Sequence, residues 1–348
     1  MTSNPSFDKE TGALQVAETY ASQCANKIVL VTGVSIGGLG EATARALAHG
    51  GASTVIITGR NDAKLAEARN AIASDYPKST IRPLKLDLSS FASIKKAAQE
   101  ILSDEKIPHL DILIHNAGGH ALENKRLETS NGIEVHFGGN HIGPFYLTNL
   151  LLPKLRVAAE KNAPGATRIV ILTSLGMIAS PVRFTDYQYE RHSTDVPDDE
   201  KPVGWPVLSR MFGGATPDPP FYLHDIAYGA SKTANCLHAV QLNRLFNREG
   251  IRAFSVSPGF AHSTGVKNAM PRFSEDIVAN FGFLKSIDQG ASTTLVAALD
   301  PVLDPEEVVV LHDCQKAGPE VPAYATDRDA AERLWKLSEE IVAERSGM

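Results

Sequence analysis

The sequence predicts an α/β fold of the Rossmann type, a doubly wound parallel sheet of about seven strands. Short apolar runs rich in β-branched residues alternate with helix-length amphipathic segments, and the first run leads directly into a glycine-rich turn. Strand–helix alternation repeated this often is typical of a parallel sheet with helices on both faces. A sheet covered on both faces also explains why most of the runs are continuously apolar.

Seven segments are the expected strands: Ile28–Thr32, Thr54–Thr58, Leu84–Leu88, Leu110–Ile114, Arg168–Thr173, Arg252–Ser257 and Val308–Leu311. The expected helices lie at residues 40–49, 62–75, 91–102, 131–161, 226–248, 288–299 and 328–345. Together these elements predict a single domain over residues 1–348.

Three segments lie outside this alternation. Residues 1–25 precede the first strand as an N-terminal extension, for which we expect one short helix. Residues 180–224 are rich in proline, glycine and charge, and residues 260–286 separate the sixth strand from its helix. Because long loops in a compact domain are usually functional or disordered, we interpret 180–224 as an insertion and 260–286 as a substrate loop.

Composition limits the classes of function. The net charge of −6, with no dense run of lysine and arginine, argues against a nucleic-acid partner. No apolar stretch approaches 18 residues, so no membrane anchor is expected. The three cysteines lack CxxC spacing and predict free thiols in a reducing compartment. The polar first residues do not resemble a signal peptide, and we expect a cytoplasmic enzyme.

The first expected strand runs into the turn Thr32–Gly40, which opens a helix. Glycines at a strand-to-helix turn let the backbone approach a pyrophosphate, whose charge lies against the helix N-terminus. The turn therefore predicts a dinucleotide site. The expected contacts are Gly33, Ser35, Ile36, Gly38, Leu39 and Gly40.

Arg60 stands where a dinucleotide fold places the residue that binds the adenosine ribose, about 20 residues after the glycine turn. An acidic residue there would bind the ribose 2′-hydroxyl of NAD. Arginine suits a 2′-phosphate instead, and Lys64 adds a second positive charge, so we expect NADP(H). Further contacts are expected from the ends of the third and fourth strands: Asp87, Leu88, Asn116, Ala117 and Gly118.

Tyr228 and Lys232 are four residues apart in an expected helix and therefore share one face. A free phenol titrates near pH ~10 and exchanges protons poorly at neutrality. A fixed positive charge favours the phenolate, and we expect Lys232 to lower the pKa of Tyr228 toward working pH. The pair predicts an acid–base centre.

In this order, the motifs resemble those of the short-chain dehydrogenase/reductase family over roughly residues 26–260. The family pattern is a TGxxxGxG turn, an NAG element, an Asn, a Ser and YxxxK. The matching residues are Thr32, Gly33, Gly38 and Gly40, then Asn116 to Gly118, Asn140, Ser174, Tyr228 and Lys232. The chain is most similar to the retinol-dehydrogenase and WW-domain-oxidoreductase branch, through Asn140-His-Ile-Gly, Phe184-Thr-Asp186 and Leu334-Trp-Lys-Leu-Ser-Glu.

The resemblance implies a role for each of these residues. Tyr228 exchanges the proton with a carbonyl or alcohol, and Ser174 hydrogen-bonds the substrate oxygen. Lys232 holds the nicotinamide ribose, and Asn140 anchors a water that resupplies the proton. Pro258, Gly259 and Thr264, with Ser263 as the alternative to Thr264, are expected to face the nicotinamide. Pro144 has no N–H for the Asn140 carbonyl, which we predict is free to hold that water.

The chain departs from the family pattern in three places. The glycine turn has one extra residue, which leaves open whether Ser35 or Gly37 contacts a given phosphate. His115 replaces the usual Asn before NAG and is expected to pack. Ser174 and Tyr228 are 54 residues apart, and the insertion 180–224 accounts for the excess over the usual dozen or so.

The insertion and the substrate loop are expected to wall the substrate pocket with apolar and aromatic side chains, although about half of these should only pack the loops. His262 lies between them and is expected at the surface. The candidate wall residues are Phe184, Tyr187, Trp205, Met211, Phe212, Phe221, Tyr222, Met270, Phe273, Phe281 and Phe283.

We therefore expect an NADP(H)-dependent oxidoreductase that interconverts a ketone or aldehyde and an alcohol on a bulky hydrophobic molecule, in the manner of secondary metabolism. A cyclase, isomerase or dehydratase that uses Tyr228 without redox chemistry is the alternative enzyme. An NADP-binding regulatory protein is the alternative outside enzymes. Family members often pair through helices corresponding to 140–160 and 226–248, which leaves a homodimer open.

Overall fold

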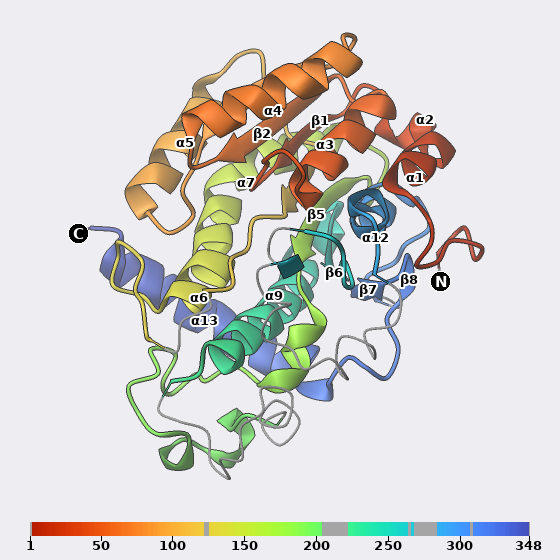
Figure 1. The fold of residues 1–348 in the computed structure, drawn as a ribbon. Helices are drawn as coiled ribbons and strands as arrows, with labels where there is room; N and C mark the ends of the chain where they lie inside the picture. Colours follow the sequence, from red (N-terminus) through yellow and green to blue (C-terminus); the bar gives the residue numbers. More distant parts are fainter. Residues whose placement is uncertain are drawn as a thin grey trace.

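The computed structural model describes residues 2–121, 125–203, 222–263, 266–267, 284–306 and 309–347. Within these ranges the chain forms one eight-stranded sheet in the order β3-β2-β1-β4-β5-β6-β7-β8 (Figure 1). Neighbours from β3 to β7 pair in parallel, and only β7 and β8 are antiparallel. The predicted doubly wound α/β class is confirmed.

The strands are β1 (Ile28–Val31), β2 (Thr54–Gly59), β3 (Thr80–Lys85), β4 (Ile112–His115), β5 (Thr167–Leu172), β6 (Ile251–Ser257), β7 (Val310–His312) and β8 (Gln315–Lys316). The helices are α1 (Ala13–Thr19), α2 (Ala21–Cys24), α3 (Leu39–His49), α4 (Asp62–Asp75), α5 (Phe91–Ser103), α6 (Val135–Phe137), α7 (Gly143–Lys161), α9 (His224–Phe246), α12 (Ile287–Leu299) and α13 (Arg328–Arg345). None of the described helices combines the length and apolar character needed to cross a membrane.

Two apolar cores lie on opposite faces of the sheet. Helices α1, α3, α4 and α12 contribute to one core, and α5, α7, α9 and α13 to the other. The central strands β1, β4 and β5 are buried along their whole length, as their continuous apolar runs predict.

The third strand differs from its prediction. It covers Thr80–Lys85 instead of Leu84–Leu88, so Asp87 lies two residues beyond it. β3 is an edge strand in which buried and exposed positions mix, and it contains Pro83, a residue that edge strands tolerate. The buried leucines at positions 84, 86 and 88 continue past the end of β3, which explains why the predicted strand is shifted toward the C-terminus.

Three further predictions need correction. The N-terminal extension forms two short helices, α1 and α2, and not one. A short eighth strand extends the expected seven. The expected helix at 131–161 is interrupted by a π-helical turn over Gly138–Ile142, between α6 and α7. A π-turn of this kind often marks a functional site.

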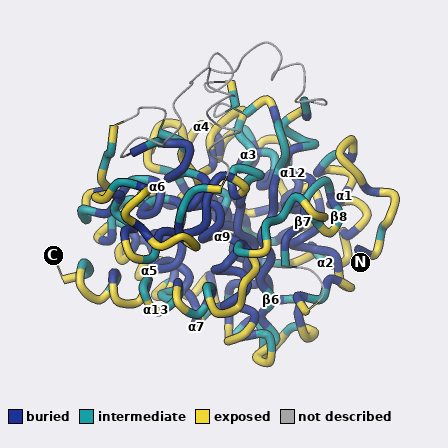
Figure 2. The backbone as a smooth tube through the Cα atoms, turned by 90° about the horizontal axis from the view of Figure 1, so that it is seen from below, coloured by how far each residue is buried: buried dark blue, intermediate teal, exposed yellow. Residues whose placement is uncertain are grey.

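Helix α9 is buried almost all round, and its tube runs dark blue through the middle of Figure 2. The sheet covers one side, and the C-terminal helix α13 packs against it with Trp335. Trp335 also meets the Phe145 ring of α7 edge to face at 4.8 Å. Burial on several sides explains why α9 shows little amphipathic pattern in the sequence.

The described part of the insertion, 180–203, is anchored to the body. Glu200 is buried and accepts hydrogen bonds from the backbone and side chain of Thr185. It also pairs with Arg333 of α13 at 3.0 Å, and the Arg333 guanidinium stacks on the ring of Phe184 at 4.3 Å. The insertion therefore begins as a packed structure and not as a free loop.

Gly143, the first residue of α7, lies against the segment that follows β3. A Cβ added to Gly143 would overlap the Leu88 carbonyl oxygen and also approach the Leu88 Cβ at 3.0 Å. Because Gly143 has no side chain, α7 can approach residues 87–88 closely. Part of the cofactor site is predicted on these two residues.

Gly143→Ala should lower the free energy of unfolding by about 1–3 kcal/mol or more, because the backbone must move to relieve the overlap. Gly139→Ala is the matched control, since its added methyl would meet nothing within 4 Å. Thermal and urea unfolding of both variants check this. Equal stability of the two variants would contradict the packing described here.

Candidate active site

Helix α9 carries both residues of the predicted acid–base centre. The Lys232 ammonium nitrogen lies 5.5 Å from the centre of the Tyr228 ring. It also donates a hydrogen bond to the Leu172 carbonyl at the end of β5, at 3.1 Å. Asn235, on the same helix, donates to that carbonyl as well, at 2.9 Å. The carboxyl end of β5 therefore fixes the lysine beside the tyrosine.

Ser174 reaches Tyr228 because two glycines allow close packing. A Cβ on Gly229 would lie 2.6 Å from the Gly176 carbonyl oxygen, and one on Gly176 would lie 3.0 Å from the Tyr228 ring. The 3₁₀ turn Leu175–Ala179 thus packs directly on α9. Ser174 caps this turn through the Gly176 N–H at 3.1 Å and makes a side-chain hydrogen bond with Tyr228.

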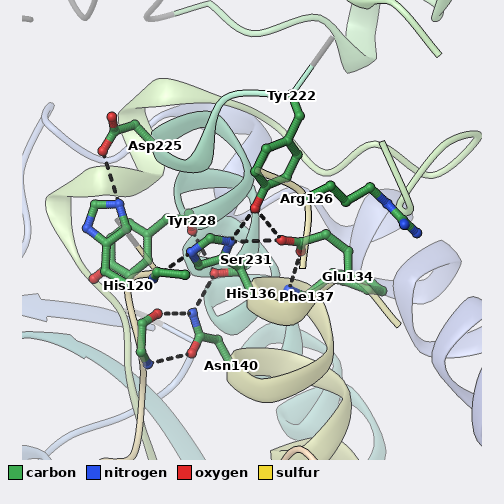
Figure 3. Close-up of polar contacts among 12 residues, drawn as sticks. His120, Arg126, Glu134, His136, Phe137, Asn140, Tyr222, Asp225, Tyr228 and Ser231 are labelled. Atoms are coloured by element: carbon green, nitrogen blue, oxygen red, sulfur yellow. Dashed lines mark hydrogen bonds and ion pairs between the residues drawn. The ribbon is translucent and has the colours of Figure 1, made fainter. Parts of the chain in front are cut away.

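Asn140 lies in the π-turn, and its side chain joins two other segments. Its Oδ1 accepts from the Gly119 N–H at 2.8 Å, and its Nδ2 donates to the Gly119 carbonyl and to Ser231 Oγ, both at 3.0 Å. Ser231 Oγ in turn donates to the Tyr228 carbonyl at 2.6 Å. Figure 3 shows this chain of contacts below Tyr228. Asn140 therefore holds the loop after β4 against the catalytic helix.

The π-turn contains the hydrogen bond from the Gly143 N–H to the Gly138 carbonyl. An α-helical partner for the Asn140 carbonyl would be the N–H of residue 144, which is proline and has none. Both residues are helical, as the hypothesis of a water-binding carbonyl requires. The water itself stays a prediction.

The electrostatics of the pair differ from expectation. Burial raises the pKa of Tyr228, the hydrogen bond from Ser174 lowers it, and the charge of Asp225 raises it further, with a net upward shift. Burial also lowers the pKa of Lys232 to about 8. The predicted lowering of the Tyr228 pKa by Lys232 is therefore wrong for this structure, because desolvation of the phenol dominates. Tyr228 is a neutral phenol at neutral pH.

The nucleotide turn has the geometry that close approach of a cofactor requires. Gly33 has φ +71°, and a Cβ there would lie 2.7 Å from the Ala117 Cα. A Cβ on Gly40 would lie 2.6 Å from the Gly33 carbonyl oxygen. Asn116 Nδ2 donates to the carbonyls of Thr32 and Gly33, at 2.8 and 3.0 Å. The ends of β1 and β4 are thus locked together at the carboxyl edge of the sheet, where α/β folds bind ligands.

Some backbone groups of the glycine turn already have hydrogen-bond partners within the protein. The Gly37 N–H donates to Glu41 at 2.6 Å, so this amide already has a partner. The Ser35 carbonyl accepts from the Gly38 N–H at the start of α3. Leu39 packs partly on the core, whereas Ile36 is 44% exposed. The extra residue in the turn left open whether Ser35 or Gly37 contacts a given phosphate. Because the Gly37 amide already has a partner, Ser35 is the better candidate.

Arg60 and Lys64 are both exposed, after β2 and in the first turn of α4. Neither side chain makes an ion pair with any residue of the described ranges, whereas Asp62 between them pairs with Lys85. Two positive charges without an anionic partner stand where the resemblance places the adenosine ribose.

The remaining cofactor candidates have varied surroundings. Asp87 Oδ1 accepts from the N–H and hydroxyl of Ser89, and the Leu88 side chain is in the core, so only its backbone remains for a ligand. Pro258 follows β6, and Gly259 has φ +71° and lies beside Lys285. Ser263 accepts from the Val266 N–H.

Several predicted residues lie outside the described ranges: Thr264, Trp205, Met211, Phe212, Phe221, Met270, Phe273, Phe281 and Phe283. Among the described aromatic candidates, Phe184 packs under Arg333, and Tyr187 lies 5.5 Å from the ring of Phe137. Both side chains pack against the body of the protein, as expected for about half of the candidate wall residues. His115 is buried and hydrogen-bonds Thr148, which confirms that it packs, and His262 is exposed as expected.

Gly118 permits the approach of Lys232. A Cβ added there would lie 2.9 Å from the lysine nitrogen. Asn116 Oδ1 is buried and has no hydrogen-bond partner among the described residues, so it is available to a bound group. These features fit a dinucleotide whose nicotinamide ribose lies near Lys232 and Gly118.

A group of polar residues lies beside Tyr228, and of its members only Tyr222 was a candidate from the sequence, as a residue of the pocket wall. The His120 ring stacks on the Tyr228 ring with centres 4.3 Å apart, and its Nε2 lies 3.0 Å from Asp225 Oδ1. Next to it, Glu134 is fully buried and contacts His136 Nδ1 at 2.8 Å and the Tyr222 hydroxyl at 2.9 Å. The only sequence signal was the position of His120, two residues after the NAG element.

A doubly wound sheet, a glycine turn at the end of β1 and a Ser–Tyr–Lys set on α9 define a nicotinamide-dependent oxidoreductase of the Rossmann type. A family model described as "short chain dehydrogenase" matches residues 27–188. The chain is 35% identical to oxidoreductase fscI of Fusarium equiseti over 73% of its length and 94% of that protein. It is 33% identical to mouse retinol dehydrogenase 12, over 92% of this chain and 87% of that one.

The chain belongs to the short-chain dehydrogenase/reductase family. Solved structures agree: an uncharacterised protein from Mycobacterium paratuberculosis superposes with a TM-score of 0.63 and 25% identity, covering 92% of this chain and 94% of that one. Chicken fatty-liver carbonyl reductase with bound NADPH shares the fold, with a TM-score of 0.57, 19% identity and coverage of 84% and 99%. The family model ends within the insertion, before Tyr228, as the unusual Ser–Tyr distance would cause.

Gly118→Ala should leave stability almost unchanged, because the clash is with the flexible end of a side chain. It should lower turnover on the order of tenfold to a hundredfold, since Lys232 is displaced. Gly119→Ala, whose methyl would meet nothing within 4 Å, should have a much smaller effect. Steady-state kinetics and thermal unfolding of both variants check this. Equal losses of activity would contradict the assigned contact.

Proposed function

We propose that the protein is an NADP(H)-dependent reductase that converts a ketone or aldehyde on a bulky hydrophobic molecule to an alcohol, with the reverse oxidation as the same reaction run backward. The observation that carries this proposal is the hydrogen-bonded Ser174–Tyr228 pair, with Lys232 held beside it at the carboxyl end of β5. The bound cofactor supplies the hydride.

The protein's own groups supply the proton. Ser174 and Tyr228 both offer a hydroxyl to a substrate carbonyl oxygen, which gains negative charge as the carbon is reduced. Because the pKa of Tyr228 is raised, the phenol is protonated at neutral pH and can act as the donor. Protonated Lys232 would stabilise the phenolate that remains. A protonated phenol is the form that the reduction requires.

The preference for NADP(H) is supported by Arg60 and Lys64. An arginine offers several donors to a phosphate in a fixed geometry, and a lysine adds a point charge. Neither residue is engaged with an acidic residue of the described ranges, so neither must give up an ion pair to bind a 2′-phosphate.

The hydrophobic substrate class is supported by two observations. The aromatic and apolar residues of the segments 180–224 and 260–286 are numerous in the sequence. The mouse relative is named for retinol, an apolar alcohol, and it aligns with most of this chain. A homodimer formed through α9 would have to displace α13, so any partner subunit is expected on a different surface.

Tyr228→Phe should lower the rate of reduction about 10²–10⁴-fold and leave NADPH binding nearly unchanged, because only the proton donor is lost. The test uses a panel of apolar ketones and aldehydes, with NADPH oxidation followed at its absorbance band. The wild-type rate should fall above pH about 8, where Lys232 loses its proton. Full turnover by the variant, or product formed without NADPH oxidation, would overturn the proposal.

Arg60→Ala should raise the KM for NADPH on the order of tenfold to a hundredfold, as expected for the loss of a charge-assisted hydrogen bond to phosphate. The KM for NADH should hardly change. Arg69→Ala, at an exposed position on the helix α4 that follows Arg60, is the control and should alter neither value. A parallel loss with both cofactors would contradict recognition of the 2′-phosphate.

A further inference from the structure

A cluster of two histidines and one carboxylate lies beside Tyr228, outside the Ser–Tyr–Lys set. Asp225 Oδ1 is 3.0 Å from His120 Nε2, and Asp225 Oδ2 is 3.1 Å from His224 Nε2. The three residues can each present one ligand atom so that all three atoms lie within 4.8 Å of one another. We propose that His120, His224 and Asp225 bind one divalent transition-metal ion of the Zn²⁺ class.

The spacing of these atoms fits coordination. Imidazole nitrogens and carboxylate oxygens lie about 2.0–2.2 Å from a zinc ion, which places neighbouring ligand atoms roughly 3–3.5 Å apart. The observed 3.0 and 3.1 Å are close to this range. Two imidazoles with one carboxylate favour zinc and similar ions over Mg²⁺ and Ca²⁺, which prefer oxygen ligands.

Simple hydrogen bonding does not account for all of the cluster. His120 Nε2 and Asp225 Oδ2 are buried atoms without a hydrogen-bond partner among the described residues, although they lie 3.0 Å from Asp225 Oδ1 and 3.1 Å from His224 Nε2, respectively. At 3.0 Å, His120 Nε2 and Asp225 Oδ1 are near enough to bond but are not aligned for it. Ligand atoms that converge on a common ion show this same combination of short distance and poor alignment.

The position of His120 is fixed from both sides along the chain. Asn140 holds both backbone groups of Gly119, and the Ala121 N–H donates to His136 Nε2 at 3.0 Å. Figure 3 shows the His120 ring over Tyr228, with Asp225 at the far side. His224 and Asp225 are consecutive residues in the first turn of α9. The ligands therefore come from two anchored segments, as a preorganised site requires.

Access and composition also suit a bound ion. The His120 side chain is 22% exposed, whereas that of Asp225 is 10% exposed, so the cluster lies near the surface on the His120 side. Three protein ligands leave at least one coordination position open, as in zinc sites that bind water or substrate. Because the His120 ring is stacked on the Tyr228 ring, a bound ion would lie close to the proposed catalytic tyrosine. Metal binding at this site does not depend on the reaction proposed above.

Direct metal binding tests the proposal. Tag-free protein, first treated with a chelator, is titrated with Co²⁺ while its visible absorption is followed, and Zn²⁺ is then added to displace it. We expect one ion per chain and a spectrum of nitrogen and oxygen ligands. His120→Phe, which keeps a ring on Tyr228, and Asp225→Asn should each weaken binding by at least about tenfold to a hundredfold.

His49→Gln, on the surface of α3 and far along the chain, is the control and should bind like the wild type. NADPH binding by each variant shows that it is folded. The proposal is overturned if the wild type takes up no stoichiometric ion, or if His120→Phe and Asp225→Asn both bind like His49→Gln. If the wild type binds the metal ion but shows no NADPH-dependent reductase activity, the proposed function is rejected and the metal site is retained.

Discussion

The side-chain amide of Asn140 is the contact on which the geometry of the site depends. It uses its oxygen and both hydrogens to hold Gly119, in the loop after β4, against Ser231 of α9. The amide can do so because the chain forms a π-turn there, which places Asn140 on the inner side of the helix. Loss of either element would remove the contacts that tie Gly119, between the NAG motif and His120, to α9.

Burial of α9 determines the electrostatics of this site. Lys232 is buried between the end of β5 and the loop that carries Gly118, and this weakly hydrated environment lowers its pKa to about 8. The same environment raises the pKa of Tyr228. Before a cofactor binds, Tyr228 is therefore a neutral phenol beside an ammonium group, that of Lys232, which loses its proton easily. A bound cofactor would add its phosphates and ribose as new partners for Lys232.

The sequence was sufficient for the main features of the fold and for the prediction that Ser174, Tyr228 and Lys232 lie together. Continuous apolar runs located the central strands because both faces of these strands are covered. The edge strand β3 was misplaced because its burial pattern is mixed. The break at Gly138–Ile142 was missed because nearly every residue from His136 to Thr148 is buried, so no polar face marks the interruption. The upward pKa shift of Tyr228 could not be derived from spacing, since desolvation depends on how the folded chain packs around the phenol.

The described C-terminal end of the insertion contacts a buried polar group close to Tyr228. Tyr222, at its C-terminal end, donates to the buried carboxylate of Glu134, which also accepts from the Phe137 N–H and from His136. Since the Ala121 N–H occupies Nε2 of His136, the proton of this imidazole is on Nδ1 and faces Glu134. A displacement of Tyr222 would leave a buried carboxylate short of one donor, a cost that resists the movement. The C-terminal end of the insertion and the loop that carries His120 are therefore both hydrogen-bonded to the Glu134–His136 pair, beside the Tyr228 ring.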